Sequence, residues 1–244
     1  MLWHKTIGAG GAGGAGGGIT VSPEGEWAEG AFGSTNTTVT GSISLGAAPS
    51  SGFRRYIVVS IGGGASVSSG DIPINSITSG SLDSLTSAVA TSTGGSFEQN
   101  SEIWYYEDNT STADTFTVVS GTSSFFGRAS IGIQAYAIYC PDTLSLSVSD
   151  TDSSITSSTS SISATVSTSD VLIACGDVRN GESDPANTSL TGPTGFSRES
   201  ALDTSAGEEN FVSGYAVDIG GTVTLSDTAS TQQKCIVAAA FNFT

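Results

Sequence analysis

Short segments of alternating apolar and polar residues, separated by turn-forming residues, run through most of this chain. The clearest are TTVTGSISLG (37–46), SEIWYYED (101–108), TFTVVSG (115–121) and GIQAYAIYC (132–140). A period of two residues is typical of a strand with one buried face. No 12-residue window has a convincing helical period, and the strands recur at spacings of about eight to twelve residues, as in sandwiches and jelly rolls. The sequence therefore predicts an all-β fold, an antiparallel β-sandwich that is jelly-roll-like.

The strongest strand of the first half is RRYIVVSIGGG (54–64), whose run Tyr56 to Val59 is apolar on both faces. A strand with two apolar faces needs cover on both sides, so we expect it to lie in the middle of a sheet. In the second half, DVLIACGDVRN (170–180) has an apolar run that needs sheet partners.

The remaining segments are weaker in pattern. Residues 65–100 suggest a meander of thin strands, and residues 180–210 read as a long loop rich in Gly, Asp and Asn. Residues 145–169 are low in complexity, but Ile155, Ile162 and Val166 keep an alternation that a free linker lacks. We therefore predict strands there, with the last strand woven into the sheet. The sequence shows no exact internal repeat, which argues against a solenoid or propeller.

The chain opens with a tether made almost wholly of glycine and alanine. Residues 1–19 form this arm, and residues 20–244 are expected to form a single β-sandwich domain. The arm has a bulky tip of Leu2, Trp3 and His4, with Ile7 behind it. It is too poor in large apolar residues for a secretory signal, and no 18-residue apolar stretch follows that could insert into a membrane. We expect a protein that is made and kept in a cytoplasm.

The acidic balance excludes one class of partner. With 7 basic and 23 acidic residues the formal net charge is −16, which would repel a phosphate backbone, so we expect no nucleic acid partner. Solubility is the simplest role for this charge, and calcium binding is the alternative. Two clusters have hard oxygen ligands: SDTDSS, with Asp150 and Asp152, and EDNTSTAD, with Glu107, Asp108, Asn109 and Asp114. Because Asp, Asn and Ser also build ordinary turns, the turn interpretation is preferred and no metal site is predicted.

Catalytic chemistry has little support. The only histidine is His4, on the arm, so neither a Ser-His nor a Cys-His system is expected in the body. A glycosidase would need two carboxylates across a cleft, for which Glu102, Glu107 and Asp177 are candidates, but such pairs arise easily in an acidic chain. We predict no catalytic residue, no cofactor and no enzyme activity.

The three cysteines lie in apolar strand contexts. Cys140, Cys175 and Cys235 are too few for a closed disulfide framework and form no CxxC pair. Buried free thiols are the preferred interpretation, and a bridge between Cys140 and Cys235 is the alternative if their strands adjoin.

Three aromatic residues in succession are the best candidate for a receptor face. Trp104, Tyr105 and Tyr106 lie on one strand, where consecutive side chains point to opposite sides. At least one must face outward unless it is covered, and it could then stack on a sugar. A buried core or a subunit interface is the more common place for such residues.

The strand cores resemble those of a known family. GSISLGAAPSSGFRRYIVVSIGG, SEIWYYED, TFTVVSG, GIQAYAIYC, DVLIACGD and IVAAAF are similar to blocks in small β-sandwich virion proteins, of the tail-fibre, tail-tip or head-decoration type, from tailed bacteriophages that infect alphaproteobacteria. The likeness covers most of residues 40–244. It implies a structural or host-recognition role and supplies no catalytic residue.

The resemblance gives the arm a function. It implies a tail-tip, baseplate or tail-fibre protein of the virion, assembled in the host cytoplasm, that docks on other virion proteins through Leu2, Trp3, His4 and Ile7. The body would form a homotrimer and touch a host surface glycan. The alternatives are a capsid decoration protein or head fibre, and, from another class, a carbohydrate-binding module.

Overall fold

The computed structural model describes thirteen segments of the chain. They are residues 18–29, 38–65, 74–79, 85–92, 98–120, 130–141, 143–154, 159–164, 171–179, 188–203, 209–218, 221–227 and 233–243. Every element in them is a β-strand and every strand pairing is antiparallel. The all-β antiparallel prediction is confirmed. Within these segments there is no helix long and apolar enough to cross a membrane.

The first eight strands form two sheets. They are β1 (Thr20–Glu29), β2 (Thr38–Ser44), β3 (Arg54–Ala65), β4 (Ile74–Ser79), β5 (Thr86–Ser92), β6 (Glu98–Glu107), β7 (Ala113–Ser120) and β8 (Ser130–Cys140). Sheet A has the order β1-β8-β3-β6-β5, and sheet B has the order β2-β7-β4.

The last eight strands repeat this arrangement. They are β9 (Leu144–Ser154), β10 (Thr159–Ala164), β11 (Val171–Arg179), β12 (Thr188–Thr191), β13 (Ser197–Asp203), β14 (Glu209–Val217), β15 (Gly221–Asp227) and β16 (Lys234–Phe243). Sheet C has the order β9-β16-β11-β14-β13, and sheet D has the order β10-β15-β12. When eight is subtracted from each strand number, sheet C becomes sheet A and sheet D becomes sheet B.

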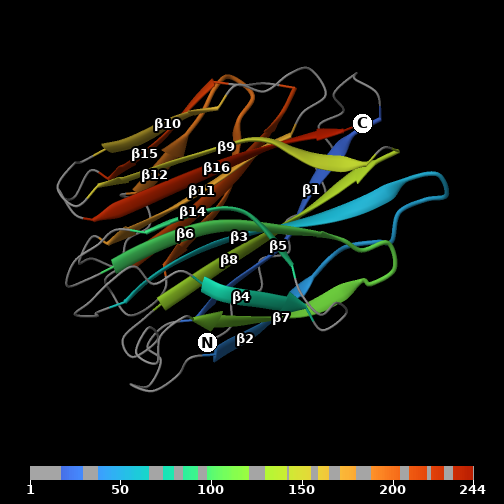
Figure 1. Cartoon of the computed structure of the whole chain (residues 1–244), viewed down its shortest axis with the longest axis horizontal. Helices are drawn as coiled ribbons and strands as arrows, with labels where there is room; N and C mark the ends of the chain where they lie inside the picture. Colours follow the sequence, from blue (N-terminus) through green and yellow to red (C-terminus); the bar gives the residue numbers. More distant parts are fainter. Residues whose placement is uncertain are drawn as a thin grey trace.

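The chain is thus built from two units of one topology, unit 1 (β1–β8) and unit 2 (β9–β16). We number the strands of each unit from first to eighth in chain order. In each unit the first, eighth, third and sixth strands then form a sheet that faces the second, seventh and fourth strands, as in a jelly roll, and the fifth strand extends the larger sheet. The four sheets stack in the order B, A, C, D, which is the order of the layers in Figure 1. The stack therefore has four layers, with the β-sandwich arrangement that the sequence predicts in each unit. The expectation of a single domain over residues 20–244 stays a prediction.

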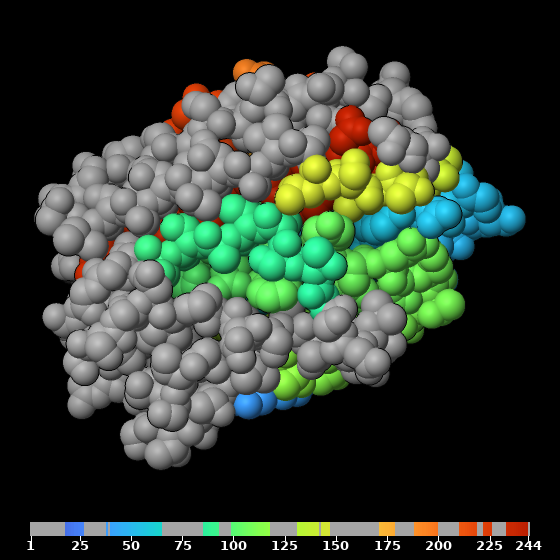
Figure 2. Space-filling model, in the orientation of Figure 1, coloured from blue at the N-terminus to red at the C-terminus, as the bar shows by residue number. Residues whose placement is uncertain are grey.

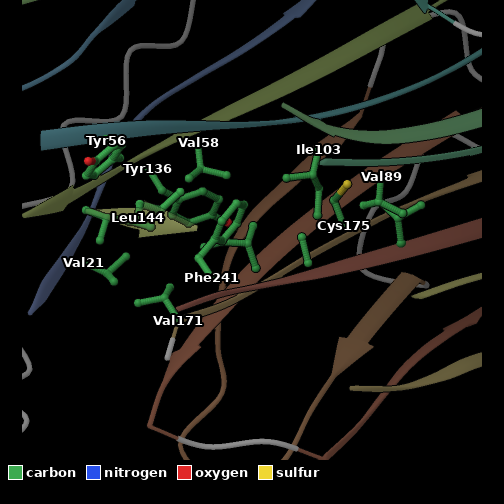
Figure 3. Close-up of a cluster of buried hydrophobic side chains, with 14 of the residues drawn as sticks. Val21, Tyr56, Val58, Val89, Ile103, Tyr136, Leu144, Val171, Cys175 and Phe241 are labelled. Carbon is green, nitrogen blue, oxygen red and sulfur yellow. The ribbon is translucent and has the colours of Figure 1, made fainter. Parts of the chain in front are cut away.

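Three apolar cores separate the four layers. Ile57 and Val59 of β3 face sheet B, while Tyr56 and Val58 of the same strand face sheet C. Leu172 of β11 in turn faces sheet D. Figure 3 shows side chains from both central sheets converging in the middle core, which joins the two units.

The prediction that 54–64 lies in the middle of a sheet is confirmed, and 170–180 has the sheet partners that its apolar run requires. β3 and β11 are each the third strand of a five-stranded sheet, and each is covered on both faces. The edges of the central sheets also meet, because β5 packs beside β9, as the green and yellow surfaces of Figure 2 show.

Two weaker segments have different outcomes. The strand prediction for 145–169 is confirmed by β9 and β10. The interpretation of 180–210 as one long loop is wrong, because β12 and β13 lie within it. These strands are short and polar, and a few apolar residues such as Leu190 and Phe196 hold them to the third core.

Candidate functional site: the terminal end of the body

The boundaries of both units lie at one end of the molecule. Thr20, at the start of β1, pairs with Tyr139 near the end of β8, and Leu144, at the start of β9, pairs with Phe243 at the end of β16. Only a short connection separates Tyr139 from Leu144. We call this the terminal end; it lies at the right of Figure 1, where β1 begins. Because Gly18 precedes β1, the N-terminal arm joins the body here.

A buried arginine holds the terminal end together. Arg55, at the start of β3, is fully buried and donates to four main-chain carbonyls. Its Nε bonds to Asp108 O at 2.7 Å, and its Nη1 bonds to Leu45 O at 3.1 Å and Ala47 O at 2.9 Å. Its Nη2 bonds to Ser111 O and lies 3.6 Å from Asp108 Oδ1. One guanidinium therefore ties the β2–β3 connection to the β6–β7 connection.

The β6–β7 connection is an acidic turn in which Asp108 bonds the local backbone through Oδ1, while its Oδ2 is buried without a hydrogen bond among the described residues. Asp108 Oδ1 accepts hydrogen bonds from the main-chain N–H groups of Thr110, at 2.9 Å, and Ser111, at 3.0 Å. Burial alone would raise the pKa of Asp108, but these bonds and Arg55 outweigh it and hold that pKa below its ordinary value. Asn109 Oδ1 accepts from Arg55 N at 2.8 Å, and Glu107 forms an exposed ion pair with Arg54 at 3.2 Å.

This geometry is that of a turn in which side chains cap the local backbone, the interpretation preferred from the sequence. Among the described residues no group of three acidic, histidine or cysteine side chains is arranged to hold a metal ion. The other acidic cluster, with Asp150 and Asp152, lies in β9, where the structure describes only the backbone.

One apolar side chain is exposed beside the root of the arm. The ring of Phe53, 38% exposed, is the large hydrophobic side chain left open among the described residues. It lies against Gly18, where an added Cβ would be 3.6 Å from the ring. Gly18 has a φ of +87°, a conformation that favours glycine. The arm therefore leaves the body next to an apolar surface.

The anchoring residues predicted from the sequence are Leu2, Trp3, His4 and Ile7. They lie outside the described residues, so their prediction is untested by the structure.

The predicted receptor face is wrong for two of its three residues. Trp104 and Tyr106 face sheet B and are buried in the first core. Trp104 donates its indole N–H to Glu102 Oε2 at 2.6 Å, and the Tyr106 hydroxyl donates to Asp114 Oδ2 at 2.8 Å. Because the second sandwich layer covers this face, neither ring can stack on a sugar.

Tyr105 points to the opposite side and is half-buried. Its ring packs edge-on against Phe241 of sheet C, with 5.4 Å between the centroids. Tyr105 thus packs in the middle core between the two units, whereas Trp104 and Tyr106 pack in the first core between sheets A and B.

The acids named as glycosidase candidates do not form a pair across a cleft. Glu102 faces sheet B, where Asn100 Nδ2 also donates to it at 2.8 Å, whereas Asp177 is buried between sheets A and C. Glu107 is exposed at the terminal end and is paired with Arg54.

All three cysteines are buried and free. Cys140 lies at the terminal end of β8, whereas Cys235 lies at the opposite end of the stack, near the start of β16. The alternative of a bridge between them is therefore wrong. Burial raises the pKa of the Cys175 and Cys235 thiols above their ordinary value.

We expect these thiols to be unreactive in the folded protein. A thiolate is the reactive form, and both the raised pKa and the lack of access oppose its attack on a reagent. With a chromogenic disulfide at pH 8, the native protein should release almost no thiol, and the protein in denaturant should release three per chain. Fast release of a thiol without denaturant would contradict the burial of these residues.

Sequence reasoning missed Arg55. Its signal was the doublet Arg54-Arg55 at the start of a two-faced strand, where one of two neighbours must point inward. Arg55 is two residues before Ile57 and so shares the face toward sheet B.

No protein-family model matches the chain, and a search of curated proteins found no significant match.

Proposed function

We propose that this chain is a structural protein of a tailed-phage particle, attached to a tail tip, baseplate or tail fibre by its N-terminal arm. One observation carries the proposal most directly: the arm joins the body at the end where Arg55 fixes the connections, and the opposite end has no chain terminus among the described strands. The arm can then attach the terminal end of the body to the particle, and the opposite end of the body points away from that attachment.

The arm and the body suit different tasks. The arm sequence combines many glycines, the most permissive residues for the backbone, with Leu2, Trp3 and Ile7, whose apolar side chains a groove on a partner could bury. The body, with three cores between four layers, is the part that the arm would attach to the particle.

The polar groups of the body support a structural role. Asp108 and Asp114 accept hydrogen bonds that close turns and cores, and Glu102 binds Trp104 and Asn100. These carboxylates stabilise the fold instead of lining a cleft. The resemblance of the strand cores to virion proteins points the same way, and the homotrimer and the host glycan remain predictions.

The test is co-sedimentation with particles, separated heads and separated tails of the phage that carries the gene. We expect full-length protein to sediment with tails and a version lacking residues 1–17 to stay in the supernatant. Trp3→Ala should weaken binding, while Thr6→Ala, on the same arm, should not.

Each other outcome has a defined meaning. Binding to heads alone would make this a decoration protein or head fibre. Binding that survives deletion of the arm would contradict arm-mediated anchoring, and binding to neither part would contradict a virion role.

A further inference from the structure

The four sheets have eight outer edges, and five of these edge strands carry a β-bulge. The pairing registers skip one residue in each of β1, β4, β5, β9 and β13, at Glu24, Asn75, Ala88, Ser147 and Glu199. Bulges on edge strands prevent a further strand from adding to the sheet. A sixth edge, β12, is only four residues long, which is also a form of protection.

The two remaining edges, β2 and β10, have none of these features. β2 pairs with β7, and β10 with β15, without a register shift. Their sequences, TVTGSIS and TSSISA, contain no charge and no proline. The two strands also occupy the same position in the two units, since β10 is β2 plus eight. In the part of the chain that the structure describes, each of them therefore has a hydrogen-bonded neighbour on one side alone.

The open side of β2 presents hydrogen-bonding groups of alternate residues. Leu45, just after β2, donates its main-chain N–H to Thr112 O at 3.0 Å, so Leu45 and Thr112 form a hydrogen-bonded pair. The alternation then directs the odd-numbered residues of β2 toward β7. The N–H groups of Thr40 and Ser42 therefore point away from β7, toward the open edge.

The strands β2 and β7 present no exposed acidic or basic side chain at this edge, in a chain of net charge −16. The exposed face of sheet B carries hydroxyls bonded across strands, Thr40 to Thr117 at 3.3 Å and Ser42 to Thr115 at 2.9 Å. The acid in β7, Asp114, is buried and bound by Tyr106. The sequence of β10 also lacks charge, although the neighbouring strand β9 contains Asp150 and Asp152.

We propose that β2 of one copy of this chain pairs with β10 of a second copy. Head-to-tail pairing in a closed ring uses each open edge once and leaves none exposed, whereas pairing of β2 with β2 would leave both β10 edges open. This inference concerns how copies assemble and is independent of the proposed phage role.

The test compares two substitutions at one residue of the full chain. Ser42→Pro removes an N–H on the open side, where an edge strand tolerates proline, and Gly41 before it is permissive. Ser42→Ala loses the same hydroxyl bond to Thr115 but keeps the N–H. By light scattering after size exclusion, we expect wild type and Ser42→Ala to be oligomers and Ser42→Pro to have a lower mass. Far-ultraviolet circular dichroism should show the same fold in all three.

Hydrogen exchange identifies the partner strand even if the proline variant is less stable. In the wild-type assembly, amides of β2 and of β10 should both be protected, and dilution to monomer should release both. A monomeric wild type, an unchanged mass for Ser42→Pro, or release of β2 while β10 stays unchanged would each overturn the proposal.

Discussion

Replacing Arg55 by methionine is expected to lower the free energy of unfolding by about 3–5 kcal/mol, the usual cost of breaking a buried charge network by removing one partner. Methionine fills much of the same space but leaves four carbonyls and the Asp108 carboxylate without the guanidinium. Chemical denaturation followed by circular dichroism measures the loss. Limited proteolysis should then cut first in residues 45–53 or 108–112, the two connections that Arg55 joins.

The neighbouring residue provides the matched control. Arg54→Met removes a cation of the same strand, but its ion pair with Glu107 is exposed, so we expect little or no change. Arg55→Lys should fall between the two variants, because an ammonium cannot reach four carbonyls in the plane of the guanidinium. Equal stabilities for Arg54→Met and Arg55→Met would contradict the role assigned to Arg55.

The strand pattern predicted the centre of the fold well. Where apolar residues occupy both faces, as from Tyr56 to Val59 in β3, the sequence demands cover on both sides, and the four-layer stack supplies it. The thin, polar strands β12 and β13 could not be recognised, because they depend on contacts with a core that other segments build.

The burial of the aromatic strand shows the limit of a local argument. Period two placed Trp104 and Tyr106 on one face and Tyr105 on the other, as observed. Whether the first face was open depended on sheet B, whose strands come from distant parts of the sequence. The sequence could place the side chains relative to one another but could not say what covered them.

The repeated strand order was not evident in the sequence because the two central sheets differ in the size of the side chains on their facing surfaces. Gly62 pairs with Ser101 and Gly132 in sheet A, whereas Asp177 pairs with Phe211 and Cys235 in sheet C. The two units thus share a strand order but diverge in the surfaces that meet.

That divergence leads to the second large effect, at Phe211 of β14. Its ring fills a hollow over the bare backbones of β3 and β8: an added Cβ would lie 2.3 Å from the ring at Gly62 and 2.6 Å from Phe211 Cβ at Gly132. The equivalent contact of unit 1 is small and polar, with Ser101 Oγ 3.1 Å from Cys235 Sγ. The large side chain of one unit thus fits the small ones of the other and sets how the units meet.

Phe211→Ala is therefore expected to cost about 3–5 kcal/mol of unfolding free energy, through lost burial and the cavity left between the units. Gly62→Ala should cost about 1–3 kcal/mol, because its methyl group collides with ring carbons of Phe211 that alanine at 211 would lack. The double variant tests whether the two side chains contact each other. When the Phe211 ring is absent, the new methyl group occupies the cavity that the ring leaves. The double variant should therefore be more stable than the sum of the two single losses predicts. Phe53→Ala, at an exposed ring, is the control for loss of a phenyl group and should change little. Strict additivity of Phe211→Ala and Gly62→Ala would mean that the two residues do not meet, and that this contact does not specify the docking of unit 1 on unit 2.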